Sequence, residues 1–138
     1  MFGINPKIPL VVTVSANLKK AMDVPFQNWP TWIKNGVVDF VVAMVYTNDN
    51  QKFKDFTGVV ANEAGNKGGI IINVKSSTPG LDTKRMLEQV TIARDVGRFS
   101  CISIFEYRGL MNECVDALRQ ELFRESSCTS YYKRRPVR

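Results

Sequence analysis

Four apolar runs alternate with amphipathic stretches along the chain. The runs are rich in β-branched residues, which is typical of strands buried in a parallel sheet. They cover Ile8–Ala16, Val37–Tyr46, Gly69–Lys75 and Ser100–Tyr107. Their starts at residues 8, 37, 69 and 100 are separated by 29, 32 and 31 residues. This even period predicts one strand–helix unit repeated four times.

The stretches between the runs carry apolar residues at helical spacing. The expected helices are Gln51–Ala64, Thr83–Val96 and Met111–Phe123. Asp82 or Thr83 is the expected cap of the second of these, and Gly97 is its expected end. A shorter helix is expected between Pro30, which suits a first helical position, and Gly36, which suits the residue just past the end.

Two α/β architectures accept four such units: an open doubly wound sheet and half of a (β/α)₈ barrel. A full barrel usually has about 250 residues, and this chain has 138. A nucleotide-binding doubly wound sheet should carry a glycine-rich loop after its first strand, but residues 16–20 (A-N-L-K-K) contain no glycine. The glycine-rich turn at residues 65–69 precedes a strand, so it cannot direct a helix N-terminus at phosphate.

We therefore predict a half barrel of four parallel strands in sequential order over residues 1–123, with a small open parallel sheet as the alternative. Residues 124–138 are polar and then basic, and are expected to form a tail. The net charge is +6 and the pI is near 9.4. Because the charge is spread along the chain, no nucleic-acid partner is expected. The sequence shows no signal-peptide pattern and no transmembrane run, so no membrane partner is expected.

Several kinds of chemistry are excluded by residue type. The chain contains no histidine, which removes Ser-His-Asp and Cys-His nucleophiles and most zinc sites. Its three cysteines, Cys101, Cys114 and Cys128, are spaced for neither zinc nor a disulfide framework. We expect no metal and no cofactor.

Four segments together resemble one family. The run W-P-T-W-I-K-N-G-V-V-D-F-V-V-A-M-V-Y at Trp29–Tyr46 is similar to the "W…W…G-x-x-D-x-x-x-x-M-x-Y" segment of bacterial glycosyl-hydrolase-like, family-10-like proteins. The similarity continues through Gly68–Ile72, through Gln89–Gly97 ("Q-I-x-x-A-R-x-x-G") and through Ile104–Tyr107 ("x-F-x-Y"). The resemblance covers about residues 8–123.

This resemblance implies strands five to eight of a TIM barrel and an activity on glycosidic bonds. It places important acidic residues on the first four strands, which this chain lacks, so hydrolysis is expected only with the missing half. It also implies a bacterial protein that is secreted or associated with the cell envelope. The alternative is a non-catalytic fragment or a self-associating structural or binding module.

Glycoside hydrolysis usually takes two carboxylates. Glu106 lies nearest the C-terminal end of a predicted strand and is the catalytic candidate, and Asp49 follows the second strand. Asp39 lies at the N-terminal end of its strand, where barrel residues serve stability, and is expected to pair with a lysine or a backbone amide.

The C-terminal ends of parallel strands share one edge, so the polar residues that follow them should gather there. The substrate-binding candidates are Tyr46, Met44, Asn17, Asp49 and Lys75, with Ser15 beside them. Tyr46 offers an aromatic ring for a sugar. The exposed edges of a half barrel also predict that the chain pairs with a second copy or with its missing half, or is poorly soluble.

Overall fold

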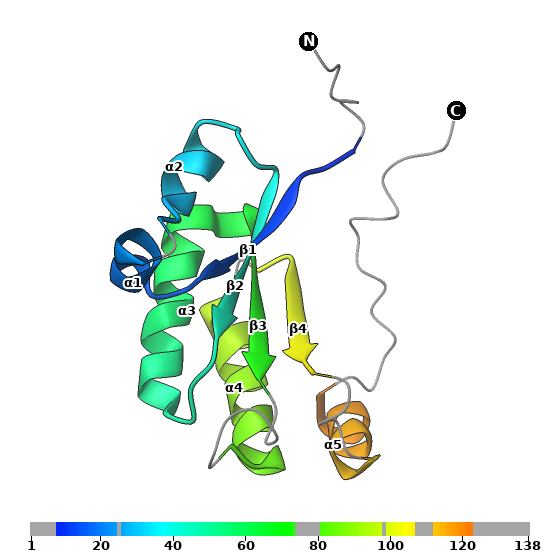
Figure 1. Ribbon diagram of the computed structural model, residues 1–138. Helices are drawn as coiled ribbons and strands as arrows, with labels where there is room; N and C mark the ends of the chain where they lie inside the picture. Colours follow the sequence, from blue (N-terminus) through cyan, green and yellow to red (C-terminus); the bar gives the residue numbers. More distant parts are fainter. Residues whose placement is uncertain (1–7, 25, 74–80, 98, 107–111, 123–138) are drawn as a thin grey trace, which may run out of the picture.

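The computed structural model describes residues 8–24, 26–73, 81–97, 99–106 and 112–122. Four parallel strands form one sheet: β1 (Val11–Ser15), β2 (Phe40–Val45), β3 (Gly68–Asn73) and β4 (Cys101–Phe105). Their order is β1-β2-β3-β4, so each strand pairs with its neighbours in the sequence (Figure 1). This confirms the predicted sequential order. It excludes the doubly wound arrangement, in which the strand order reverses within the sheet.

The helices follow the predicted rhythm with one addition. They are α1 (Leu18–Asp23), α2 (Trp29–Lys34), α3 (Asn50–Ala64), the 3₁₀ turn η1 (Gly65–Lys67), α4 (Thr83–Val96), α5 (Asn112–Ala117) and the π-helical segment η3 (Leu118–Leu122). The prediction for α4 is confirmed at both ends, and Gly97 ends it with φ +65°. The addition is α1, which occupies the segment after β1, where the sequence analysis names no helix.

Two of the strands begin three residues later than the predicted apolar runs: β1 at Val11 in place of Ile8, and β2 at Phe40 in place of Val37. Leu10, just before β1, donates its backbone N–H to Oδ2 of Asp39 at 2.8 Å. The backbone N–H groups of Asp39 and Phe40 donate in turn to the Leu10 carbonyl. Asp39 therefore joins the starts of β1 and β2, which confirms its expected structural role with a backbone amide.

The α-helices and η3 share one core with one face of the sheet. The buried strand residues of this core are Val14, Val41, Ala43, Val45, Ile70 and Ile72. They pack with Trp29 from α2, Phe53 from α3 and Met86 from α4, among others. Even the last described helical segments join it, through Cys114 and Leu118. Sequential order thus places the helices on a single side of the sheet (Figure 1).

The other face of the sheet carries the alternate strand residues and is called the open face below. Its members, by strand alternation and register, are Val11, Thr13, Ser15, Phe40, Val42, Met44, Gly69, Ile71, Asn73, Cys101, Ser103 and Phe105. No residue of this set belongs to the core described above. The apolar run at Val37–Tyr46 predicts a strand buried in a parallel sheet, and in the structure helices cover one face of β2.

Substituting the cap of α4 should cost a modest and predictable amount of stability. The Asp82 carboxylate accepts a hydrogen bond from the backbone N–H of Arg85 at 2.8 Å. We expect Asp82→Ala to lower the free energy of unfolding by about 1 kcal/mol, measured by urea denaturation. Asp82→Asn, which keeps a capping oxygen, should stay within a few tenths of a kcal/mol of wild type. An equal loss in both variants would contradict a capping role.

Candidate functional site

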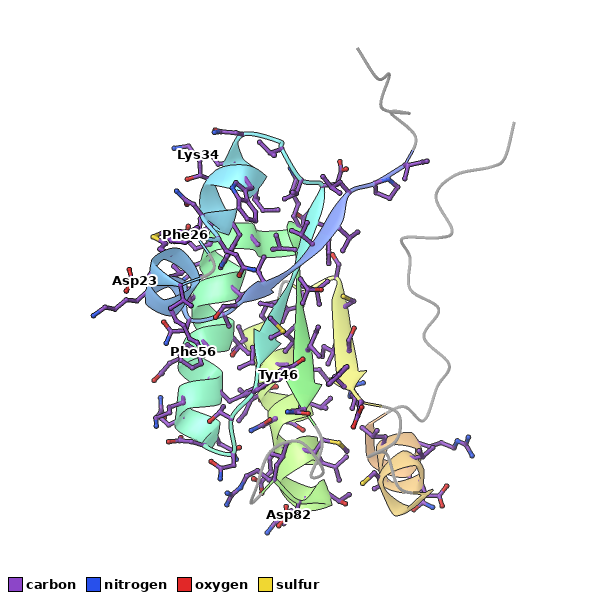
Figure 2. All side chains as sticks on the ribbon, in the orientation of Figure 1. Asp23, Phe26, Lys34, Tyr46, Phe56 and Asp82 are labelled. Carbon is purple, nitrogen blue, oxygen red and sulfur yellow. The ribbon has the colours of Figure 1, made fainter. Side chains whose placement is uncertain are left out.

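The C-terminal ends of β1 and β2 border a groove with a volume of about 480 Å³. The residues that line it are Ser15, Asn17, Lys20, Val24, Gln27, Met44, Tyr46 and Phe56. Four of these, Ser15, Asn17, Met44 and Tyr46, are residues that the sequence predicts to gather at this edge. Figure 2 shows Tyr46 just past the end of β2 and Phe56 on α3.

Tyr46 is the most exposed predicted residue of this groove. It is 42% exposed, and its ring stacks with that of Phe105, with 6.2 Å between ring centroids and 23° between ring planes. Phe105, the last residue of β4, is itself 48% exposed. Partial burial raises the pKa of the Tyr46 hydroxyl above its ordinary value, so at neutral pH the hydroxyl remains a donor. The two rings form an accessible aromatic surface at the sheet edge.

The end of β1 is fixed by side chains on both sides. The backbone N–H of Ser15 donates to Oε1 of Gln27 at 3.0 Å, and its carbonyl accepts from Nε1 of Trp29 at 3.1 Å. Asn17 caps α1, because its Oδ1 accepts from the backbone N–H of Lys20 at 3.1 Å. These bonds hold the polar wall of the groove in place.

The loop between β2 and α3 is anchored to α4. Nε2 of the buried Gln89 donates to the Thr47 carbonyl at 2.8 Å, and Nη1 of Arg85 donates to the Asn48 carbonyl at 3.0 Å. Nδ2 of Asn50 donates to Oε2 of Glu88 at 2.8 Å. The segment that follows Tyr46 is therefore tied down at three points.

Asp49 lies at the same edge of the sheet but does not line this groove. Its Oδ1 accepts from the backbone N–H groups of Gln51 at 2.9 Å and Lys52 at 3.1 Å, which makes it the cap of α3. It lines a separate hollow with Asn48, Asn50, Gln51 and Arg85. Its assignment as a substrate-binding residue stays a prediction.

Glu106 directly follows β4 at the C-terminal edge and is half-buried. The peptide bond that joins it to Phe105 is cis. Lys75, the remaining substrate-binding candidate, lies outside the described residues, as does the tail at 124–138. Glu106 is thus placed at the predicted edge, and its catalytic role stays a prediction.

The sequence did not indicate Phe105 as the stacking partner of Tyr46, nor Lys20, Gln27 and Phe56 as residues of the groove. Lys20 and Gln27 belong to α1 and the segment after it, and the signal for α1 was Asn17 followed by a helix-compatible L-K-K-A-M-D stretch. Phe105 carried no local signal, because its contact with Tyr46 depends on strand order.

Within the described ranges, no three His, Cys, Asp or Glu side chains lie together in an arrangement that could hold a metal ion. Over the same ranges, no helix combines the length and apolar character needed to cross a membrane. Comparison of the chain with protein-family models, curated proteins and solved structures found no match.

Proposed function

We propose that this chain binds carbohydrate at the C-terminal edge of its sheet, as half of a glycoside-hydrolase-like barrel. The observation that carries the proposal is the half-exposed Tyr46–Phe105 pair beside a groove lined by the side chains of Ser15, Asn17 and Gln27. Sugars present C–H groups on their ring faces and hydroxyl groups around the rim. An aromatic surface next to amide and hydroxyl groups complements both features.

The half-barrel part of the proposal is supported by the shape of the open face. Strands two apart in a sheet lie roughly 9.5 Å from each other, and β2 and β4 are separated by β3. Tyr46 follows β2 and Phe105 ends β4, yet the centroids of their rings lie only 6.2 Å apart. Side chains from β2 and β4 are expected to converge over β3 when the face is concave. A barrel wall is also expected to carry helices on its outer side only.

Hydrolysis is proposed to require a carboxylate from outside the single chain. Two carboxyl groups must lie about 5–5.5 Å apart for retention or about 6.5–9.5 Å apart for inversion. Asp49 and Asp82, which lie at the C-terminal edge, both accept hydrogen bonds from helix N-termini. Glu106 remains as the candidate acid. This favours binding without turnover by the isolated chain, which is also what the alternative of a non-catalytic binding module requires.

Tyr46→Ala tests the proposal. We expect the substitution to weaken oligosaccharide binding 10- to 100-fold, which corresponds to about 1.4–2.7 kcal/mol, because the stacking surface is lost. The measurement is isothermal titration calorimetry with xylohexaose, cellohexaose and chitohexaose. Tyr46→Phe is the matched control: it keeps the ring and should retain affinity within a few-fold for the sugar that binds.

Two results would contradict the proposal. If wild type binds none of the three sugars, the carbohydrate function is wrong for these classes. If wild type binds one of them and Tyr46→Ala binds it equally well, the ligand lies elsewhere and Tyr46 leaves the site. Urea denaturation of each variant shows that any loss of binding occurs in a folded protein.

A further inference from the structure

The open face carries no charged residue. Its members, as defined above, are aliphatic, aromatic, sulfur-containing, hydroxyl, amide or glycine residues, although 23% of the whole chain is charged. A sheet face that stays in water normally alternates polar and charged side chains with the buried set. Several members are still substantially exposed in the single chain, among them Val11 at 50% and Phe105 at 48%. This composition indicates a face that is covered when the protein works.

The two outer strands also lack the usual protection of a sheet edge. Edge strands are normally blunted with lysine, proline or bulges. β1 (V-V-T-V-S) and β4 (C-I-S-I-F) contain neither lysine nor proline. They pair with β2 and β3 without a bulge. In the part of the chain that the structure describes, no strand pairs with their outer sides (Figure 1). The outer edge of β4 is therefore available for a ladder, whereas on β1 the backbone groups of Ser15 already bond Gln27 and Trp29, so a ladder there would use the earlier residues of the strand.

We infer that a second copy of this chain covers the open face and pairs with both edges, closing an eight-stranded barrel. A twofold axis along the strand direction keeps all strands parallel. It places β4 of each copy beside β1 of the other, so one partner reaches both edges at once. Eight strands is the number at which side chains just fill a barrel interior.

The area of the face favours this closure over simple stacking. Four strands spaced ~4.8 Å apart and five residues rising ~3.3 Å each give roughly 320 Å² per copy, or about 640 Å² for two faces. A stable interface buries roughly 1,200–2,000 Å². Two faces stacked without their edges fall short of that range and leave two ladders unmade. Edge pairing adds the contacts of two strand pairs and of the helices that flank them.

Side-chain size on the open face also fits a second copy. Apart from Val11 and Phe105, the outer strands present small residues, namely Thr13 and Ser15 on β1 and Cys101 and Ser103 on β4. Apart from Gly69, the central strands present larger residues, namely Phe40, Val42, Met44, Ile71 and Asn73. Joining two copies puts the small residues of β4 and of the other copy's β1 side by side, which leaves interior room for the larger residues of the central strands. A short peptide added to one edge would leave the other edge and the face uncovered.

Closure also completes the proposed site, a consequence that rests on the proposed function. The β4 end of the second copy, with its Phe105 and Glu106, would lie along the β1 end that borders the groove. One barrel mouth would then carry Glu106 twice, which is the number of carboxylates that glycoside hydrolysis takes.

Sedimentation velocity of the full chain from 1 to 100 µM tests the inference. The expected species is a dimer of twice 15.6 kDa. Ser103 is exposed and faces the open side of β4, so Ser103→Lys is tolerated by a single copy but buries an unpaired charge in the closed barrel. We expect it to weaken dimerisation at least 100-fold. Asn62→Lys adds the same charge at an exposed position of α3 and should leave the dimer intact.

Thr13→Lys, at an exposed position of the open face on β1, repeats the test at the opposite edge. It replaces Ser103→Lys if circular dichroism shows that the Ser103→Lys variant is unfolded. Amide hydrogen exchange of β1 and β4 in wild type should slow as protein concentration rises. A monomer at 100 µM, an assembly that grows beyond two copies, or a dimer unchanged by both lysine variants would each overturn the inference. Sugar binding through Tyr46 is measured separately and can succeed or fail in either case.

Discussion

Replacing Trp29 with alanine is expected to lower the free energy of unfolding by about 3–5 kcal/mol, a large share of the usual stability of a domain. Trp29 is fully buried in the core at the first position of α2. Its Nε1 also donates to the carbonyl of Ser15 at the end of β1. The substitution removes a large buried side chain and a link between two elements. Urea denaturation followed by circular dichroism measures the loss.

Trp29→Phe separates the packing of this side chain from its hydrogen bond. Phenylalanine keeps much of the buried area but leaves the Ser15 carbonyl without its indole donor, so we expect a loss of about 1–3 kcal/mol. Trp32→Phe is the matched control, because Trp32 is only partly buried against the same core; its loss should be smaller. Equal losses at the two tryptophans would contradict a specific role for Trp29.

Replacing Gly69 with alanine is expected to cost about 2–3 kcal/mol through overpacking. A Cβ atom at Gly69 would clash with Sγ of Cys101 and would lie 3.1 Å from a ring carbon of Phe40 and 3.2 Å from the Cys101 carbonyl oxygen. The absent side chain thus lets Phe40 and Cys101 fold over the central strand at the N-terminal end of the open face. The unfolding free energy is again measured in urea.

Two further variants show whether this contact causes the loss. Gly69→Ala combined with Cys101→Ala should lose less than the sum of the single variants, since the Sγ atom is gone, with a coupling energy of about 1 kcal/mol. Gly58→Ala is the control: no atom lies within 4 Å of its added Cβ in α3, so we expect stabilisation by about 0.5–1 kcal/mol. Additive losses in the double variant would contradict the clash with Cys101.

The order of the strands could be predicted from sequence because it depends on a period. Runs spaced evenly at about 30 residues, without a phosphate loop, left few topologies, and the structure has the sequential one. Both ends of α4 could also be predicted, from Asp82 and Gly97, because helix capping depends on residues next to the helix end. Closure of the barrel depends on a second chain and not on neighbouring residues, and it stays part of the proposal.

The site was only partly predictable. Ser15, Asn17, Met44 and Tyr46 share a groove because parallel strands bring their ends together. Sequence reasoning had no access to the side chains that enter from other elements, such as Phe105 against Tyr46, because these depend on curvature and register.

Asp49 illustrates a competing local signal. An aspartate just before a helical pattern is first a cap, and the structure shows it accepting from two backbone amides. Asp49 and Asp82, two acids at this edge, are both helix caps.

The strand order described above also bears on how the chain folds. Paired residues are separated by 29 positions for Val11 and Phe40, 27 for Val41 and Gly68, and 32 for Gly69 and Cys101. Each strand pair therefore closes a loop of similar length, with a similar entropic cost. No pairing joins the two ends of the described sheet, so assembly can start at any unit and proceed outward. Such a sheet can gain a unit at its rim while every existing strand pair remains intact, and the loss of a rim unit removes only the pair that this unit made.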